Sequence, residues 1–244
     1  MTLDHIAAAS PRTTARIAGA FYLVVIAGGI FAEIGARSRL VVAGNPAATA
    51  QNILAHEQLF RWGFATDVIA ALCVIPLILL LYEIFKVIDR RVALLALCFS
   101  LVGTAVQATA LLGHYAALII LKRGHDMGVS TDVLNAQMYM ALQLQGIGYA
   151  IGLAFFGGTM LSRGYLILHA RFVPRVIGLL LMIEGICYFI NSFANFVAPG
   201  IASTVLAVLM VSSLAEVILC LWLLVMGVDE ARWKEQALSA AARS

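Results

Sequence analysis

Six long apolar stretches run through this chain, and they constrain its fold more than any other feature. They cover residues 17–34, 64–85, 92–121, 138–161, 173–193 and 201–226. As α-helices, stretches of this length match the hydrocarbon core of a bilayer, which is about 30 Å thick. Only 12% of the 244 residues are charged, about half the share of an ordinary soluble domain. We therefore predict an all-α integral membrane protein in which six transmembrane helices form one bundle.

The basic residues predict how this bundle is oriented. With the N-terminus inside, eleven Lys and Arg residues fall in the inside segments and five in the outside loops. Loops rich in Lys and Arg stay on the cytoplasmic side of a membrane. We therefore expect both termini in the cytoplasm, with residues 1–230 forming one membrane domain and residues 231–244 a short cytoplasmic tail.

The first outside loop contains the signal for one more helix. Asn45-Pro46 places a good N-cap residue before a proline at the first helical position. We predict an extracytoplasmic surface helix over residues 47–60. Its apolar side chains would face lipid or the bundle, namely Ile53, Leu54 and Phe60.

Composition and motifs argue against several classes of function. The net charge is +3 without any basic run, so nothing indicates a nucleic acid partner. The chain has no G-x-S-x-G or Walker loop, which argues against these classes of enzyme without settling whether the protein is an enzyme, and we expect no cofactor. The cysteines lie in apolar stretches without a C-x-x-C pair, and we expect buried free thiols at Cys73, Cys98, Cys187 and Cys220.

A set of charged residues, the outer rim, lies where the first two stretches meet the outer face: Glu33, Asp67 and Arg61. Carboxylates and nearby histidines are ligands that zinc, manganese or iron use. The chain has no H-x-x-x-H or H-E-x-x-H spacing, however, and we expect no metal site. Instead Glu33 should pair with Arg37, four residues later on the same helix, and Asp67 with Arg61.

Two acidic residues fall in the middle of predicted spans. Glu184 lies ten residues after Pro174, and Glu216 lies ten residues before Met226, which puts both about 15 Å from the same membrane face. An ionised side chain at that depth costs about 2.5–3.5 kcal/mol on insertion scales. No Lys or Arg occurs at that depth in the predicted spans. We expect the two carboxyl groups to face each other without a cation, and at least one to be protonated.

Further polar side chains share helix faces in the third to sixth stretches. The fifth stretch carries four of them at positions i, i+4, i+7 and i+11, which form one face of a helix. We predict that such faces line a polar cavity that opens outward. The candidate ligand-binding residues are Glu184, Glu216, Tyr188, Asn191, Asn195, Gln107, His114 and Gln145.

Several short strings are spread from the first apolar stretch to the last. They are ARIAG at 15–19 with Tyr22-Leu23, Leu59-Phe60-Arg61 with Asp67, LYEIFKVIDR at 81–90, PRVIG at 174–178 with Gly185 and Tyr188, and Ala215-Glu216 with LWLL at 221–224 and Gly227. Together they resemble a bacterial membrane family known as domain of unknown function 4386. The resemblance implies one multi-pass unit in a bacterial inner membrane, without an established reaction. It also implies a small apolar residue where this chain has Glu184.

Three functions stay open at this point. The first is binding or transport of a small ligand or ion in the outward-opening cavity. The second is an intramembrane enzyme for a lipid-like substrate, which needs both glutamates at one pocket. The third is a structural or assembly protein, whose polar side chains only join helices. Membrane lipids are the expected partners, a small molecule or an ion is the expected ligand, and a homo-oligomer is left open.

Overall fold

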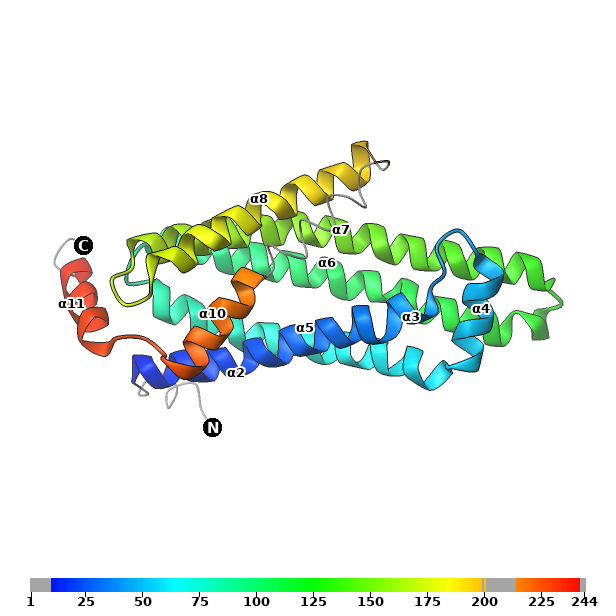
Figure 1. Cartoon of the computed structure of the whole chain (residues 1–244), viewed down its shortest axis with the longest axis horizontal. Helices are drawn as coiled ribbons and strands as arrows, with labels where there is room; N and C mark the ends of the chain where they lie inside the picture. The colour runs from blue at the N-terminus through cyan, green and yellow to red at the C-terminus, as the bar shows by residue number, and fades with distance from the viewer. Residues whose placement is uncertain (1–9, 199, 201–213, 242–244) are drawn as a thin grey trace. The chain divides into compact units, whose positions relative to one another are not determined.

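The computed structural model describes residues 10–198, 200 and 214–241, and every regular element in this part of the chain is a helix. An α-helix pairs its own backbone N–H and C=O groups, which an apolar solvent requires. The all-α prediction is confirmed. The elements are α2 (Pro11–Ile30), the π-helix η1 (Phe31–Arg37), α3 (Ser38–Leu40), α4 (Pro46–Ala55), α5 (Glu57–Phe85), α6 (Arg90–Arg123), the 3-10 turn η2 (His125–Met127), α7 (Thr131–His169), α8 (Arg175–Val197), α10 (Leu214–Val225) and α11 (Glu230–Ala241) (Figure 1).

Five helical segments are long and apolar enough to cross a membrane: Pro11–Leu40, Glu57–Phe85, Arg90–Arg123, Thr131–His169 and Arg175–Val197. The chain is therefore a helical membrane protein. The helices extend beyond the predicted spans because a helix does not end where its hydropathy falls. Part of the sixth predicted span, residues 201–213, lies outside the described residues. The described remainder forms α10, a shorter apolar helix of 12 residues.

The chain divides into two compact units. Unit 1 comprises Met1–Val24, Cys73–Gly103 and Leu153–Ser244, and unit 2 comprises Val25–Leu72 and Thr104–Gly152. Four helices are each divided between the two units, namely α2, α5, α6 and α7. The single membrane domain over residues 1–230 stays a prediction.

Unit 2 contains the short helix that the first loop predicts. The side chain of Asn45 accepts a hydrogen bond from the backbone N–H of Ala48 at 3.0 Å, and Pro46 is the first helical residue, as predicted. This helix, α4, ends at Ala55 rather than at Phe60, which belongs to α5. Its location on a membrane surface stays a prediction. The apolar core of unit 2 comprises Leu40, Ala50, Ile53, Phe60, Ala117, Leu118, Leu121, Met138 and Leu142.

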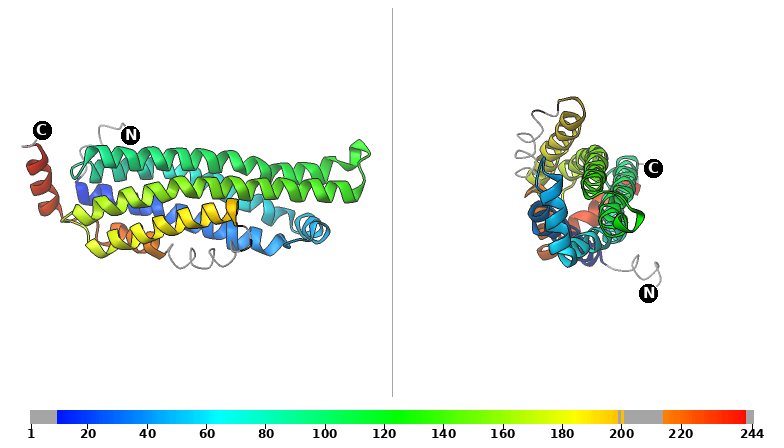
Figure 2. Two further views of the ribbon diagram at one scale, coloured as in Figure 1. Left: turned by 90° about the horizontal axis from the view of Figure 1, so that it is seen from above. Right: turned by 90° about the vertical axis from the view of Figure 1, so that its right-hand side faces the viewer.

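In unit 1, paired glycines bring α7 and α8 into close contact (Figures 1 and 2). A Cβ added to Gly185 would lie 2.8 Å from the carbonyl oxygen of Gly157, and one added to Gly178 would lie 2.8 Å from that of Gly164. Small residues at these positions let two helix backbones approach closely in a membrane, where hydrocarbon contact alone does not hold helices together.

The C-terminal helices of unit 1 also pack against earlier parts of the chain. Gly19 of α2 contacts the backbone of Leu224 in α10, because an added Cβ would lie 2.6 Å from the Leu224 nitrogen. After α10 the chain turns at Gly227, whose φ of 69° suits glycine. The indole N–H of Trp233 in α11 then donates to the carbonyl of Ile84 at 2.9 Å. The predicted tail therefore includes a helix that packs against α5.

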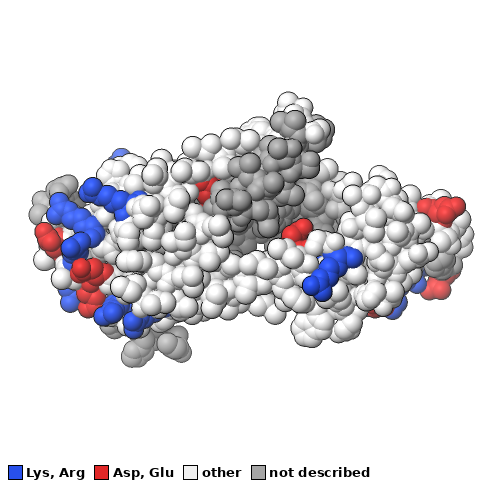
Figure 3. Space-filling view, in the orientation of Figure 1, with Lys and Arg blue, Asp and Glu red and all other residues white. Residues whose placement is uncertain are grey.

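Large apolar side chains point away from the protein on most of the long helices. Leu72, Leu112 and Leu144 expose 67%, 69% and 65% of their surface. Figure 3 shows broad areas between the groups of Lys, Arg, Asp and Glu that carry no charge. Large exposed apolar side chains over uncharged areas fit a lipid environment.

We predict that Gly185→Ala destabilises the protein, because the new methyl group would overlap the backbone of α7. Overpacking of this kind costs about 1–3 kcal/mol. Gly146→Ala is the matched control, since an added Cβ on this α7 residue meets nothing within 4 Å and alanine favours a helix. Thermal unfolding in one detergent compares the two variants with the wild type. Equal melting temperatures for both variants would contradict the close contact of α7 and α8.

Candidate functional site

Two glutamates from different helices meet at one tyrosine hydroxyl in unit 1. Glu184 and Tyr188 lie one turn apart on α8, and Glu216 lies on α10. The hydroxyl oxygen of Tyr188 is 3.1 Å from Oε1 of Glu184 and 3.4 Å from Oε1 of Glu216. The two carboxyl oxygens therefore cannot be farther apart than the sum of these distances. The predicted meeting of the two glutamates is confirmed.

The two carboxyl groups differ in their surroundings. Glu184 is 0% exposed, whereas Glu216 is half-buried. The second carboxyl oxygen of Glu184, Oε2, is buried and has no hydrogen-bond partner among the described residues. Leaving a buried polar atom without a hydrogen-bond partner costs about 1–3 kcal/mol. A partner for Oε2, or a proton on the carboxyl group, would reduce this cost.

A basic residue also belongs to this cluster, which corrects the expectation of glutamates without a cation. Arg163 lies on α7, is only 5% exposed, and donates from Nη1 to the hydroxyl of Tyr22 at 3.3 Å. Its positive charge acts electrostatically on both Glu184 and Glu216. Tyr22 also interacts with Glu216. We call these five side chains, Tyr22, Arg163, Glu184, Tyr188 and Glu216, the carboxyl cluster.

Arg163 was not predicted to lie in the bundle, because the fourth apolar stretch was taken to end at residue 161. That placement put Arg163 among the basic residues of the inside loops. The helix α7 instead continues to His169, and its apolar character resumes with Leu166 and Ile167, both fully buried. This return of apolar residues after a single arginine is the signal that would have located it inside the bundle.

Two asparagines continue the polar face of α8 beyond Tyr188. Asn191 is buried, and its side-chain oxygen Oδ1 has no partner among the described residues. Asn195 is exposed and donates from Nδ2 to the backbone carbonyl of Asn191 at 2.8 Å. The polar face of α8 therefore runs from a buried carboxyl group to an exposed amide.

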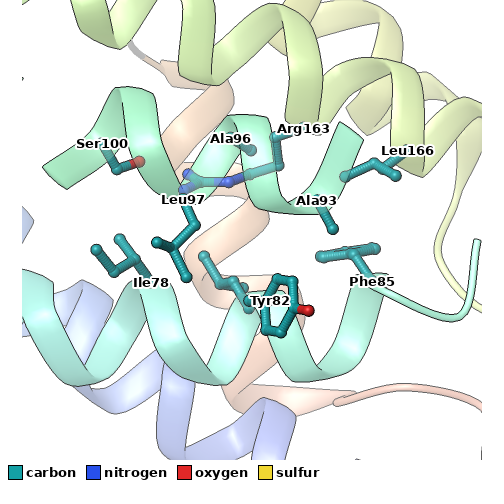
Figure 4. Close-up of a pocket in the computed structure, with 10 residues that line it drawn as sticks. Ile78, Tyr82, Phe85, Ala93, Ala96, Leu97, Ser100, Arg163 and Leu166 are labelled. Carbon is teal, nitrogen blue, oxygen red and sulfur yellow. The ribbon is translucent and has the colours of Figure 1, made fainter. Parts of the chain in front are cut away.

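A small pocket lies beside Arg163 in unit 1, between α5, α6 and α7 (Figure 4). It has room for about one water molecule. Figure 4 shows the Arg163 side chain extending past Ala96 and Leu97 toward Ser100. No predicted ligand-binding residue lines this pocket, and the outward-opening cavity stays a prediction. The lining residues are Ile78, Leu81, Tyr82, Phe85, Ala93, Ala96, Leu97, Ser100, Arg163 and Leu166.

Three of the predicted ligand-binding residues lie in unit 2, where their immediate contacts are structural. The side chain of Gln107 packs over Gly152, with its Cγ 2.5 Å from the position of an added Cβ. Gln145 packs in the same way over Gly113, at 3.2 Å. The ring of His114 stacks on Phe60 with a centroid distance of 3.9 Å.

The hydrogen bonding of His114 determines its tautomer. Nε2 lies 3.0 Å from the backbone carbonyl oxygen of Phe60. A carbonyl oxygen only accepts hydrogen bonds, so Nε2 must carry the proton. Nδ1 is buried and has no partner among the described residues. His114 thus joins α6 to α5 within the core of unit 2.

The outer rim residues form two ion-paired groups in unit 2. Arg37 donates from Nε to Glu33 at 2.8 Å and from Nη1 to Asp67, so the predicted pair of Glu33 and Arg37 is confirmed. The prediction that Asp67 pairs with Arg61 is wrong. Arg61 binds Glu57 at 2.8 Å, because residues four apart share a helix face while residues six apart do not.

The described residues contain no group of three or more His, Cys, Asp and Glu side chains arranged to hold a metal ion. The four cysteines are free. Cys220 is buried as expected, whereas Cys73 and Cys187 are half-buried and Cys98 is exposed.

Comparison with known proteins places this helical membrane protein in a family. The model of the family described as Domain of unknown function (DUF4386) matches residues 17–227. The chain belongs to this family, and the whole carboxyl cluster lies inside the matched region. No curated protein and no solved structure matches the chain.

We predict unequal effects when the two acidic partners of Arg37 are neutralised. Asp67→Asn should destabilise the protein by about 1.5–3 kcal/mol, because the Asp67 side chain is only 16% exposed and binds a charged group. Glu33→Gln is the matched control and should cost less than about 1 kcal/mol, because the Glu33 side chain is 58% exposed. Chemical unfolding in detergent measures both. A larger loss for Glu33→Gln would contradict this ranking.

Proposed function

We propose that this protein is a proton-coupled transporter of a small ligand or ion, with Glu184 and Glu216 as its proton-binding residues. Ionisable residues inside a membrane are costly, and in transporters they form proton relays. The carboxyl cluster contains two such residues in hydrogen-bond reach of one hydroxyl group.

The observation that carries this proposal is the contact of the Tyr188 hydroxyl with both carboxyl groups. A tyrosine hydroxyl has one proton and donates one hydrogen bond. It lies within hydrogen-bond distance of both Glu184 and Glu216. If it donates to one carboxylate, the other contact becomes a full hydrogen bond when that carboxyl group is protonated and donates to the phenolic oxygen. The geometry therefore favours one shared proton on the glutamate pair.

The charges of the cluster agree with one stored proton. Arg163 contributes one positive charge, and one ionised glutamate balances it. A second ionised glutamate would leave a net negative charge in an apolar bundle, which desolvation opposes. With one glutamate protonated, the cluster is neutral.

The polar face of α8 supports a route for protons to this pair. Oε2 of Glu184 and Oδ1 of Asn191 are two buried acceptors without described partners. Asn191 lies seven residues after Glu184, on the same face of the helix, and Asn195 follows it at an exposed position. Water molecules at these acceptors would connect the carboxyl pair to the end of α8.

The geometry is less suited to an acid–base enzyme acting on a lipid-like substrate. Such an enzyme needs both carboxyl groups to face the same substrate atoms. The Tyr188 hydroxyl instead lies within hydrogen-bond distance of both carboxyl oxygens. A substrate would have to displace this hydrogen-bonded side chain.

We predict that infrared spectroscopy detects one protonated buried carboxyl group in the purified protein at neutral pH. Its C=O band should disappear when the pH is raised. The band should also be lost in both Glu184→Gln and Glu216→Gln, because glutamine takes the place of the protonated carboxyl and the remaining glutamate then ionises beside Arg163.

Glu83→Gln is the control for these spectra, since the Glu83 side chain is half exposed and ion-paired with Lys86. This variant should keep the band. Absence of the band from the wild type, or its persistence in both glutamine variants of the cluster, would overturn the proposed proton site.

A further inference from the structure

Arg163 has more hydrogen-bond donors than its described neighbours use. A guanidinium group carries five N–H donors. Among the described residues, only the hydroxyl of Tyr22 accepts a hydrogen bond from it, and neither glutamate forms a direct ion pair with it. The end of the side chain extends into the pocket between α5, α6 and α7 (Figure 4). The remaining donors are therefore available to a small acceptor in this pocket.

The pocket is small and mostly apolar, which limits what it can hold. Its space of about one water molecule excludes sugars, amino acids and phosphate esters. Most of its walls are Ala, Leu, Ile and Phe side chains, and these keep the local dielectric constant low. A cation at the edge of such a space attracts a small anion more strongly than it would in water.

We propose that this pocket binds one small monovalent anion of about the size of chloride, held by Arg163, and that the anion enters together with one proton. The proton binds to the pair Glu184 and Glu216. This inference rests on the proposed function and names the ligand class that the transporter would carry.

Charge balance is the reason for the coupling. Before binding, Arg163 is positive, one glutamate is negative and the other is neutral. An anion alone would give the cluster a net negative charge. An anion together with a proton leaves Arg163 paired with the anion and both glutamates neutral. The cluster is uncharged in both states, so neither state carries the cost of an unbalanced charge in the bundle.

Other titratable groups also face the cluster and the pocket. Tyr22 comes from α2, and Cys187 and Cys220 act on the glutamates from α8 and α10. From α5, Tyr82 lines the pocket, and the ammonium group of Lys86 lies 5.8 Å from the centre of its ring. The residues of α6 that line the pocket are Ala93, Ala96, Leu97 and Ser100, none of which titrates near neutral pH.

The test measures chloride binding and proton uptake on the same sample. The purified full-length protein is kept in weakly buffered detergent solution with sodium gluconate, since gluconate is too large for the pocket. Radioactive chloride reports binding, and a pH-sensitive dye reports proton uptake. We expect about one proton for each chloride bound, and an affinity for chloride that falls about tenfold for each unit of rise in pH where the pair titrates.

Two variants test the pocket itself. Arg163→Gln should abolish chloride binding. Ala96→Val should weaken it at least tenfold without removing any charge, because the added methyl groups fill the space beside the guanidinium group. Arg171→Gln is the control and should bind like the wild type, since the Arg171 side chain is 68% exposed. Wild-type chloride binding by a folded Ala96→Val variant would overturn the assigned pocket.

The double variant E184Q/E216Q separates the anion site from the proton site. It should bind chloride more tightly than the wild type, without proton uptake and without pH dependence, because Arg163 then lacks a competing carboxylate. Wild-type chloride binding without proton uptake would overturn the coupling and the proposed function, but not the anion site. A protonated-carboxyl band without any chloride binding would overturn the anion site and leave the proposed proton site standing.

Discussion

A guanidinium group and two carboxyl groups enclosed in one apolar bundle must balance one another, and this requirement determines how unit 1 is built. An unpaired charge in such surroundings costs several kcal/mol. Arg163 and Glu184 lie on different helices, and each is followed directly by a glycine of the close contact between α7 and α8. The glycines let the helix backbones approach, and the approach brings the charged side chains into range of one another. Helix packing and charge balance therefore depend on each other.

The sequence was sufficient to predict the features that depend only on residues close together along the chain. Long apolar stretches can only form helices in lipid, and the capping signal at Asn45 and Pro46 predicts where α4 begins. The depth of Glu184 and Glu216 could be counted from the helix ends, which is why their meeting was predictable. These predictions need only the rise of a helix and the length of an apolar run.

What the sequence could not supply depends on contacts between distant residues. Arg163 was placed in a loop because a span predicted from hydropathy ends at a charged residue. In the structure, Tyr22 and the glutamates of other helices stabilise the positive charge of Arg163. The partner of Asp67 was misassigned because closeness in sequence pointed to Arg61, while the structure pairs Asp67 with Arg37. In both cases the deciding partner lies on another helix.

The two units use polar side chains differently. In unit 2, Arg37 binds two carboxylates and Glu57 binds both Arg61 and Lys122. Those charges are paired directly, and two of the pairs, Arg37 with Asp67 and Glu57 with Lys122, link different helices. In unit 1, the guanidinium group of Arg163 donates to the hydroxyl of Tyr22 and forms no direct ion pair with a described carboxyl group. The proposed anion site would use the remaining donors of this guanidinium group.

The shared proton is the central claim, and a double-mutant cycle on the two glutamates tests it most directly. The free energy of unfolding is measured in detergent without chloride for Glu184→Gln, Glu216→Gln and the double variant. Each single change should cost less than about 1 kcal/mol, because glutamine replaces a neutral carboxyl group while the other glutamate balances Arg163. The double variant should lose about 3–5 kcal/mol, because the guanidinium group is then buried without a counter-charge. Additive effects of the two single changes would contradict the shared proton.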